Sequence, residues 1–265
     1  MPALFIHFQI EGGERMTKLN LLGMSKEELL LLNPSDFADR LLSAEEVIYI
    51  AETLDAFWHY NYEAAEQGRP GKHALLKSGL HSDGFLISKI LLKPDNIRLI
   101  MAHQLKQLFE RLGIAKPDWL IGVPDGATAL AEDLGRIMGV KVADLQKREG
   151  RITVITPFKP GERLLIVEDF CTKGTGFKET VILIISKQSG AEILPYELVI
   201  VNRGGLKKIK VEGVGDFTIA PVAEHRIGEW TQEECPHLGP CKFGSIAIKP
   251  KVDEASWRDI TTSQL

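Results

Sequence analysis

Two adjacent carboxylates, Glu168 and Asp169, end an apolar run and precede the small polar run Thr172-Lys173-Gly174-Thr175-Gly176. At the carboxyl end of a parallel strand, residues face a crevice, and the next turn presents unpaired backbone N–H groups at a helix N-terminus. Such a turn binds phosphate, because its N–H groups and the helix dipole favour negative charge. The acids would repel phosphate unless they hold sugar hydroxyls or Mg²⁺, and they suit a developing positive charge. The stretch therefore predicts a site for a sugar phosphate whose ring becomes cationic in the transition state.

Two other nucleotide-binding motifs do not match this stretch. A Walker A loop requires Gly-Lys-[Ser/Thr], whereas here Lys173 precedes Gly174. A dinucleotide fingerprint requires glycine or alanine where the chain has Glu179. The remaining alternative is a strand-turn-helix corner whose acids only cap the next helix.

Helical patterns fill the N-terminal part of the chain, from Ser25 to about Gln67. Ser25 with Glu28, and Ser43 with Glu46, have the spacing of capping boxes. We expect residues 1–70 to form an N-terminal helical segment that precedes the core. The first ten residues lack a basic region and are too short to span a bilayer, so we expect no membrane contact.

Apolar runs of strand length then alternate with helical stretches, which predicts an α/β fold with parallel strands and a core over residues 71–205. The expected strands are 84–92, 119–123, 141–145, 152–155, 163–169 and 194–202. The expected helices are 94–113, 128–139 and 177–190. Glycines and short strands follow, and we expect residues 206–265 to form a small C-terminal extension packed on the core.

Composition narrows the class of partner. The chain has 265 residues, a net charge of -4 and three cysteines. The charge gives no general attraction to nucleic acid or to an anionic membrane, so the expected partner is a small molecule. So few cysteines do not make a disulfide framework, which fits a reducing compartment and a cytoplasmic protein.

The stretch from Leu164 to Gly176 resembles the phosphoribosyl-pyrophosphate (PRPP) binding motif of the type I phosphoribosyltransferases. Three further motifs are similar, in the same order, to those of orotate phosphoribosyltransferases: Leu75 to Gly79 with Ser82, the pyrophosphate loop at residues 121–131, and the strand end before Arg203. The resemblance covers roughly Leu75 to Gly205. It implies a type I phosphoribosyltransferase-like parallel sheet flanked by helices, PRPP and a base as substrates, Mg²⁺ chelated by PRPP, and a homodimer.

The resemblance also implies roles for individual residues. Glu168 and Asp169 would hold the ribose, and the turn from Thr172 to Gly176 would wrap its 5′-phosphate. The other residues expected to bind PRPP are Lys77, Pro124, Asp125 and Gly126, with Asp125 near Mg²⁺, and those expected to bind the base are Arg203, Lys77 and Phe85. Taken singly, Lys77 could be a solvated lysine, Asp125 a turn former and Arg203 a surface charge. Their order along the chain favours the functional interpretation.

The chain departs from the orotate enzymes at three places. Its pyrophosphate loop has Asp125 and Gly126 where they carry a lysine, and Phe85 belongs to a stretch that replaces a more aromatic pattern. Their long, glycine-rich catalytic loop, which acts on the neighbouring subunit, corresponds to a shorter segment that keeps Lys147 and Arg148 as catalytic candidates but contains "RITVI", a strand-like run. Orotate is the expected base. The alternatives are a purine or another base, or a PRPP-binding regulatory protein without turnover.

The tail places Cys235, His237 and Cys241 close together in the sequence. Zn²⁺ takes such ligands, but the usual C-x₂₋₄-C pair and a fourth ligand are missing, so packing is the favoured interpretation. Cys171 is not required as a nucleophile, because phosphoribosyl transfer proceeds without a covalent intermediate.

Overall fold

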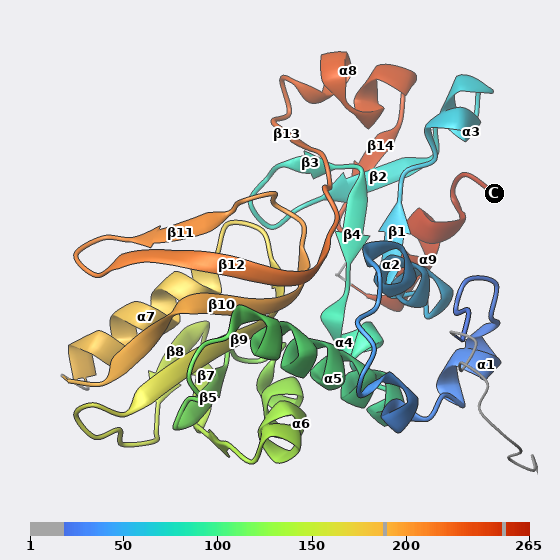
Figure 1. Cartoon of the computed structure of the whole chain (residues 1–265). Helices are drawn as coiled ribbons and strands as arrows, with labels where there is room; N and C mark the ends of the chain where they lie inside the picture. Colours follow the sequence, from blue (N-terminus) through green and yellow to red (C-terminus); the bar gives the residue numbers. More distant parts are fainter. Residues whose placement is uncertain (1–18, 188–189, 251–252) are drawn as a thin grey trace, which may run out of the picture.

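The structure is a computed structural model that describes residues 19–187, 190–250 and 253–265 (Figure 1). Its centre is a six-stranded sheet in the order β11-β12-β10-β9-β5-β6. The strands are β5 (Trp119–Gly122), β6 (Lys141–Val142), β9 (Arg163–Cys171), β10 (Glu192–Asn202), β11 (Lys208–Val211) and β12 (Gly215–Glu224). All neighbours are parallel except β11, which pairs antiparallel with β12. The α/β prediction is confirmed.

Helices cover both faces of this sheet. The side chains of β9 alternate between two apolar clusters, one on each face. Leu165 and Val167 pack in the same cluster as α2 (Ala44–Thr53), α5 (Asp95–Leu112) and α6 (Thr128–Met138). Leu164 and Ile166 point the other way, into the cluster of α7 (Thr175–Lys187) and of the hairpin β7 (Leu145–Arg148)–β8 (Arg151–Val154). A strand segment buried on both faces must be apolar throughout, as β9 is from Leu164 to Val167.

The N-terminal segment is helical with one interruption. Both predicted capping boxes are present, at the starts of α1 (Lys26–Leu30) and α2. The helical pattern read up to Gln67 does not hold throughout, because the chain turns at Asp55, whose φ is +58°, and continues as the strand β1 (Phe57–His59) before α3 (Tyr62–Glu66). A short 3₁₀ helix, η1 (Pro34–Phe37), lies between α1 and α2. Residues 1–18 lie outside the described part, including the first ten residues considered above.

Two of the expected strands are also wrong. The run 84–92 forms β4 (Gly84–Leu86) and then the helix α4 (Ser88–Leu91), since a mixed apolar run fits either element when tertiary packing decides. The run 141–145 divides between β6 and the start of β7. The strand 152–155 is present as β8, and it pairs antiparallel with β7.

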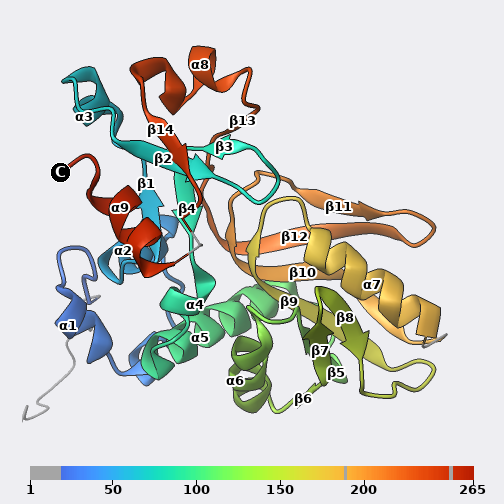
Figure 2. The same ribbon diagram turned by 180° about the vertical axis from the view of Figure 1, so that it is seen from behind.

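A second, four-stranded sheet has the order β13-β3-β2-β14 and combines distant parts of the chain. Its strands are β2 (Lys72–Leu75), β3 (His81–Ser82), β13 (Glu229–Trp230) and β14 (Ile246–Ile248). Helices α8 (Cys235–Leu238), η2 (Pro240–Phe243) and α9 (Glu254–Thr262) complete this region, which we call the hood. Figure 2 shows the hood on one side of the large sheet.

The boundary expected at residue 205 does not coincide with an edge of either sheet. β11 and β12 extend the large sheet past that residue, because alternating apolar residues of β12, such as Phe217 and Ile219, pack in its core. The hood, in turn, takes β2 and β3 from the expected core region. Among the described residues, no helix is long and apolar enough to cross a membrane.

Candidate active site

The parallel register brings three strand ends to one edge of the large sheet. Gly122 of β5 lies opposite Val167 of β9, and Asn202 of β10 lies opposite Cys171. The segments that follow these strands therefore start side by side. They are the turn before α6, the turn before α7, and the segment that begins at Arg203.

The turn after β9 has the form expected of a phosphate site. Gly174 has a φ of +63°, a conformation that side chains with a Cβ rarely adopt, and α7 begins at the next residue. The first N–H groups of α7 have no carbonyl of their own helix to bind and face outward at its positive end. Thr172 and Lys173 complete the turn, and Lys173 is exposed.

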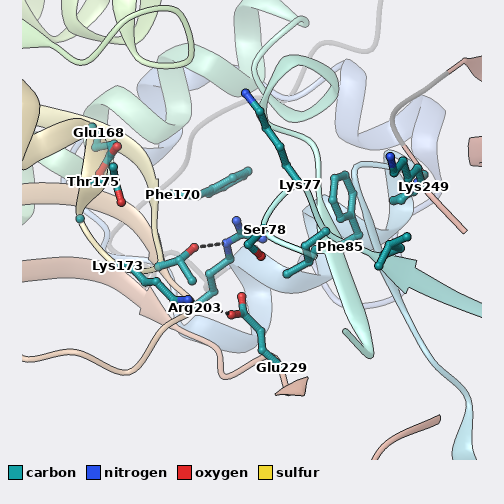
Figure 3. A pocket seen from close by; sticks show the side chains of 16 residues that line it. Lys77, Ser78, Phe85, Glu168, Phe170, Lys173, Thr175, Arg203, Glu229 and Lys249 are labelled. Carbon is teal, nitrogen blue, oxygen red and sulfur yellow. Dashed lines mark hydrogen bonds and ion pairs between the residues drawn. The ribbon is translucent and has the colours of Figure 1, made fainter. Parts of the chain in front are cut away.

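A cavity of about 630 Å³ opens between this turn and the hood. That volume suits a nucleotide-sized ligand. Its lining includes Leu75, Leu76, Lys77, Ser78, Phe85, Glu168, Phe170, Thr172, Lys173, Gly174, Thr175, Gly176, Arg203, Glu229, Lys249 and Pro250. Figure 3 shows Glu168 and Thr175 on one side of this cavity, Phe85 and Lys249 on the other, and Arg203 between them. The structure thus brings together every predicted residue of the phosphate turn and of the base site.

Arg203 is held in the middle of that lining. Its Nε donates a hydrogen bond of 2.6 Å to Oγ1 of Thr172, and its backbone N–H donates one of 2.9 Å to the carbonyl of Cys171. Burial lowers the pKa of Arg203, and the nearby carboxylates of Glu229 and Asp169 act against that shift. A guanidinium stays charged in proteins, so the cavity contains a fixed, partly desolvated cation.

The two acids of β9 have different surroundings. Asp169 is half-buried and does not line the cavity; its carboxylate lies against Gly126, where a Cβ would come within 2.1 Å of Oδ2. Glycine at position 126 therefore lets the turn after β5 approach Asp169. Asp125 is exposed beside it, whereas Pro124 is buried. None of Pro124, Asp125 and Gly126 lines the cavity, so they form an adjoining surface.

Glu168 is buried with a second acid that sequence reasoning missed. Glu197 of β10 lies opposite Ile166, which puts its side chain on the same face as Glu168, and the two carboxyl groups approach within 4.8 Å. Both Glu197 oxygens and Oε2 of Glu168 lack a well-formed hydrogen bond among the described residues. Burial, and then the proximity of Glu197, raise the pKa of Glu168 well above its ordinary value, and burial also raises the pKa of Glu197. Both shifts favour the protonated form of the carboxyl group concerned.

Lys147 and Arg148 lie on the exposed hairpin β7–β8 and do not line the cavity. The side chain of Arg148 donates to Gln146 on its own strand. The hairpin is tied to α7 by a hydrogen bond of 3.3 Å from the N–H of Ile152 to Glu179. The segment is thus an ordered pair of strands with two cations near its turn.

No family model matches the chain. Individual proteins do match it. It is 30% identical over 182 residues to an orotate phosphoribosyltransferase of Caldanaerobacter subterraneus, covering 67% of this chain and 87% of that protein. The chain belongs to the orotate phosphoribosyltransferase family.

Other members support that assignment. An orotate phosphoribosyltransferase of Heliobacterium modesticaldum is 28% identical over 202 residues, which are 75% of this chain and 96% of that protein. The crystal structure of orotate phosphoribosyltransferase from Aeropyrum pernix has a TM-score of 0.50 and 19% identity over 67% of this chain and 93% of that one. The resemblance read from the motifs is confirmed, as is the type I phosphoribosyltransferase fold.

The hood contributes residues to the cavity lining that the sequence motifs did not predict. Lys249 and Glu229 both line the cavity, and Glu229 lies 3.9 Å from Nζ of Lys173. Because these residues lie far from the motifs in the sequence, only the pairing of β13 and β14 with the small sheet brings them to the site. An acid inside the otherwise apolar β10 was the available signal for Glu197.

The buried acid pair predicts a pH-dependent stability. Since the folded-state pKa values are raised above the ordinary 4.5, ionisation should cost the native chain stability as the pH rises from that value through the raised pKa values. Glu197→Gln should remove this cost, so its free energy of unfolding relative to wild type should increase by up to about 1.4 kcal/mol per pH unit across that interval. Chemical denaturation at several pH values from 4 to 8 measures this. Glu192→Gln, on the exposed part of β10, is the control; parallel curves for all three proteins would contradict the assignment.

Proposed function

We propose that this chain transfers the phosphoribosyl group of PRPP to orotate and releases pyrophosphate. The observation that carries the proposal is the phosphate-type turn of residues 172–176, which shares one cavity with a buried acid and a fixed guanidinium. The names of the relatives support orotate as the base and phosphoribosyl as the group transferred.

The turn and the acids would bind different parts of PRPP. The N–H groups at the start of α7 would bind the 5′-phosphate, and Lys173 would add a positive charge. Asp169 would accept hydrogen bonds from the ribose, while Glu168, whose protonated form burial favours, would donate a hydrogen bond to a ribose hydroxyl oxygen. The ring becomes an oxocarbenium-like cation as pyrophosphate leaves, and the Asp169 carboxylate would stabilise that cation. A nitrogen of the base attacks C1′ and pyrophosphate leaves, so no nucleophile of the protein is needed and buried Cys171 stays outside the chemistry.

Arg203 is the base-binding residue of the proposal. Its planar fork can pair with the carboxylate of an acidic pyrimidine, and Thr172 already fixes the orientation of that fork. Phe85 and Lys77 come from the opposite wall, where an aromatic ring and an ammonium would pack against and attract the same base. A neutral purine has no carboxylate to offer to this guanidinium.

The pyrophosphate would lie over the turn after β5, at Pro124, Asp125 and Gly126. Mg²⁺ prefers oxygen ligands and substrate phosphates, and the exposed carboxylate of Asp125 fits this preference. When bound, the ion would neutralise charge on the departing pyrophosphate, with Asp125 as its protein ligand. Lys147 and Arg148 would bring further positive charge from the hairpin β7–β8, in a cytoplasmic homodimer of the kind that the family resemblance implies.

The first test measures pyrophosphate release from PRPP with a panel of bases. Orotate should support release, and adenine and nicotinate should not. The double variant Glu168→Gln/Asp169→Asn should weaken PRPP binding or abolish release, because it removes the groups that hold the ribose. Glu212→Gln/Asp216→Asn, which changes exposed acids near β12, is the control. Release with adenine alone would favour the purine alternative, and PRPP binding without release from any base would favour the regulatory alternative.

Arg203→Ala separates base binding from PRPP binding. Loss of a charged hydrogen bond costs about 1.5–3 kcal/mol, so the KM for orotate should rise by about ten- to a hundred-fold while the KM for PRPP changes little. Steady-state kinetics with each substrate varied in turn measure this. Arg226→Ala, at an exposed position outside the cavity lining, is the control. Equal increases in both KM values would remove Arg203 from the base site.

The hairpin cations act on the departing pyrophosphate in this proposal. Lys147→Ala/Arg148→Ala should therefore lower kcat about tenfold or more while the dissociation constant of PRPP changes much less. Turnover rates together with calorimetric titration of PRPP distinguish the two effects. Lys208→Ala/Lys210→Ala on the exposed face of β11 is the matched control for charge. Full turnover in the hairpin variant would show that another segment supplies this charge.

A further inference from the structure

Four potential metal ligands lie close together inside the hood, and none of them lines the cavity. His73 of β2 and His81 of β3 face Cys235 of α8 and Cys241 of η2, and one ligand atom from each lies within 4.8 Å of the other three. The sequence favoured packing for these cysteines because no further ligands were evident near them. The fold supplies two histidines from more than 150 positions earlier. His237, the residue between the cysteines, is exposed and outside the cluster.

The distances in the cluster are close to those of a tetrahedral zinc site. Sγ of Cys241 lies 3.5 Å from Nε2 of His73 and 3.3 Å from Nδ1 of His81, and Sγ of Cys235 lies 3.8 Å from Nε2 of His73. The two imidazole nitrogens are 2.8 Å apart. Zn–N and Zn–S bonds of about 2.0 and 2.3 Å at tetrahedral angles give edges of roughly 3.3–3.8 Å. Of these four distances, only the one between the two nitrogens must increase slightly to admit an ion.

Hydrogen bonds around His73 orient its metal-binding nitrogen. Ser245 Oγ donates its proton to the carbonyl of Gly71 at 3.2 Å, so it must accept from Nδ1–H of His73 at 2.9 Å. That arrangement fixes the neutral tautomer, whose Nε2 lone pair points into the cluster. A hydrogen bond to the other ring nitrogen is the usual support of a histidine that binds a metal.

The cysteine side has a similar support. The backbone N–H of Cys241 donates a hydrogen bond of 3.3 Å to Sγ of Cys235. Such N–H···S bonds stabilise a thiolate. His73 and Cys235 are completely buried and His81 is 9% exposed. Because an uncompensated charge is costly in such surroundings, the ligands themselves would have to neutralise the charge of a bound cation. Two thiolates and two neutral imidazoles around a divalent cation give a complex without net charge.

We propose that His73, His81, Cys235 and Cys241 bind one Zn²⁺ ion at a structural site. All four positions of a tetrahedral ion are then filled by protein, so the ion has no open position for a substrate. The site would fasten α8 and η2 to the strands β2 and β3 (Figure 1). The segment that connects those two strands contributes Lys77 and Ser78 to the cavity lining. The ion would therefore stabilise one wall of the cavity without being part of its lining.

The full-length protein, purified under reducing conditions without chelator, tests the proposal. Elemental analysis should find about one zinc per chain. After removal of the metal with a chelator, Co²⁺ should restore one equivalent of binding, with the sulfur-to-metal charge-transfer and d–d absorption of a tetrahedral thiolate site. Chelation should lower the unfolding temperature, and Zn²⁺ should restore it, because a ligand that binds the folded state stabilises it.

Variants locate the ion. Cys241→Ser should abolish the charge-transfer absorption and the zinc content, and Ser245→Ala should weaken Co²⁺ binding about 10- to 100-fold through the orientation of His73. His237→Ala, on the same helix as Cys235, should keep one zinc per chain and the wild-type spectrum. If Cys241→Ser does not fold, the Co²⁺ spectrum of the wild-type protein still decides whether thiolates are bound.

Three outcomes would overturn the proposal. One is a wild-type chain that neither retains zinc nor binds Co²⁺ with thiolate absorption. Another is zinc content that is unchanged in Cys241→Ser. The third is a mass lower by two hydrogens that maps to a bond between Cys235 and Cys241 in the protein as purified, since a disulfide would consume both sulfur ligands.

Discussion

The register between β9 and β10 is the constraint on which the site depends. With Val199 opposite Glu168 and Asn202 opposite Cys171, both strands end at one level, and the phosphate turn and Arg203 start there together. A slip by one residue would exchange the faces of β10, which would turn Glu197 away from Glu168 and leave each acid alone among apolar side chains. The apolar residues on both faces of the strands oppose such a slip, so the core that stabilises the fold also positions the chemistry.

The site contains groups of opposite charge that are buried to different extents. The guanidinium of Arg203 is held by Thr172 and faced by Glu229, whereas the buried acids Glu168 and Glu197 share their surroundings with each other. Burial raises the pKa of both members of the acid pair, while half-buried Asp169 lies beside the glycine of the neighbouring turn. The two adjacent acids of the motif therefore have different surroundings, although their side chains are chemically alike.

Local patterns predicted the parts of the fold in which sequence neighbours are also neighbours in space. The capping boxes, the amphipathic helices α5 and α6 and the apolar strand β9 all follow from periodicity and from end signals. The break after Leu86 did not, because an apolar run fits a strand or a helix and the packing of its surroundings decided. In the site, the motifs predicted the phosphate turn, Glu168 and Arg203. Glu197, Glu229 and the pairing of His73 with Cys241 depend on contacts across the sheets, which no local spacing encodes.

The composition of the small sheet has a consequence for the order in which the molecule can assemble. β2 pairs with β14, and Ser245 reaches Gly71 across 174 positions of chain. During synthesis, the strands β5, β9 and β10 of the large sheet leave the ribosome before β14 exists. The phosphate turn can therefore form on a nascent chain whose opposite cavity wall still lacks the residues that follow β14, such as Lys249. Closing so long a loop is slow, and β2 presents an unpaired edge until it closes. A protein with this connectivity can form the core of its large sheet before its small sheet is complete.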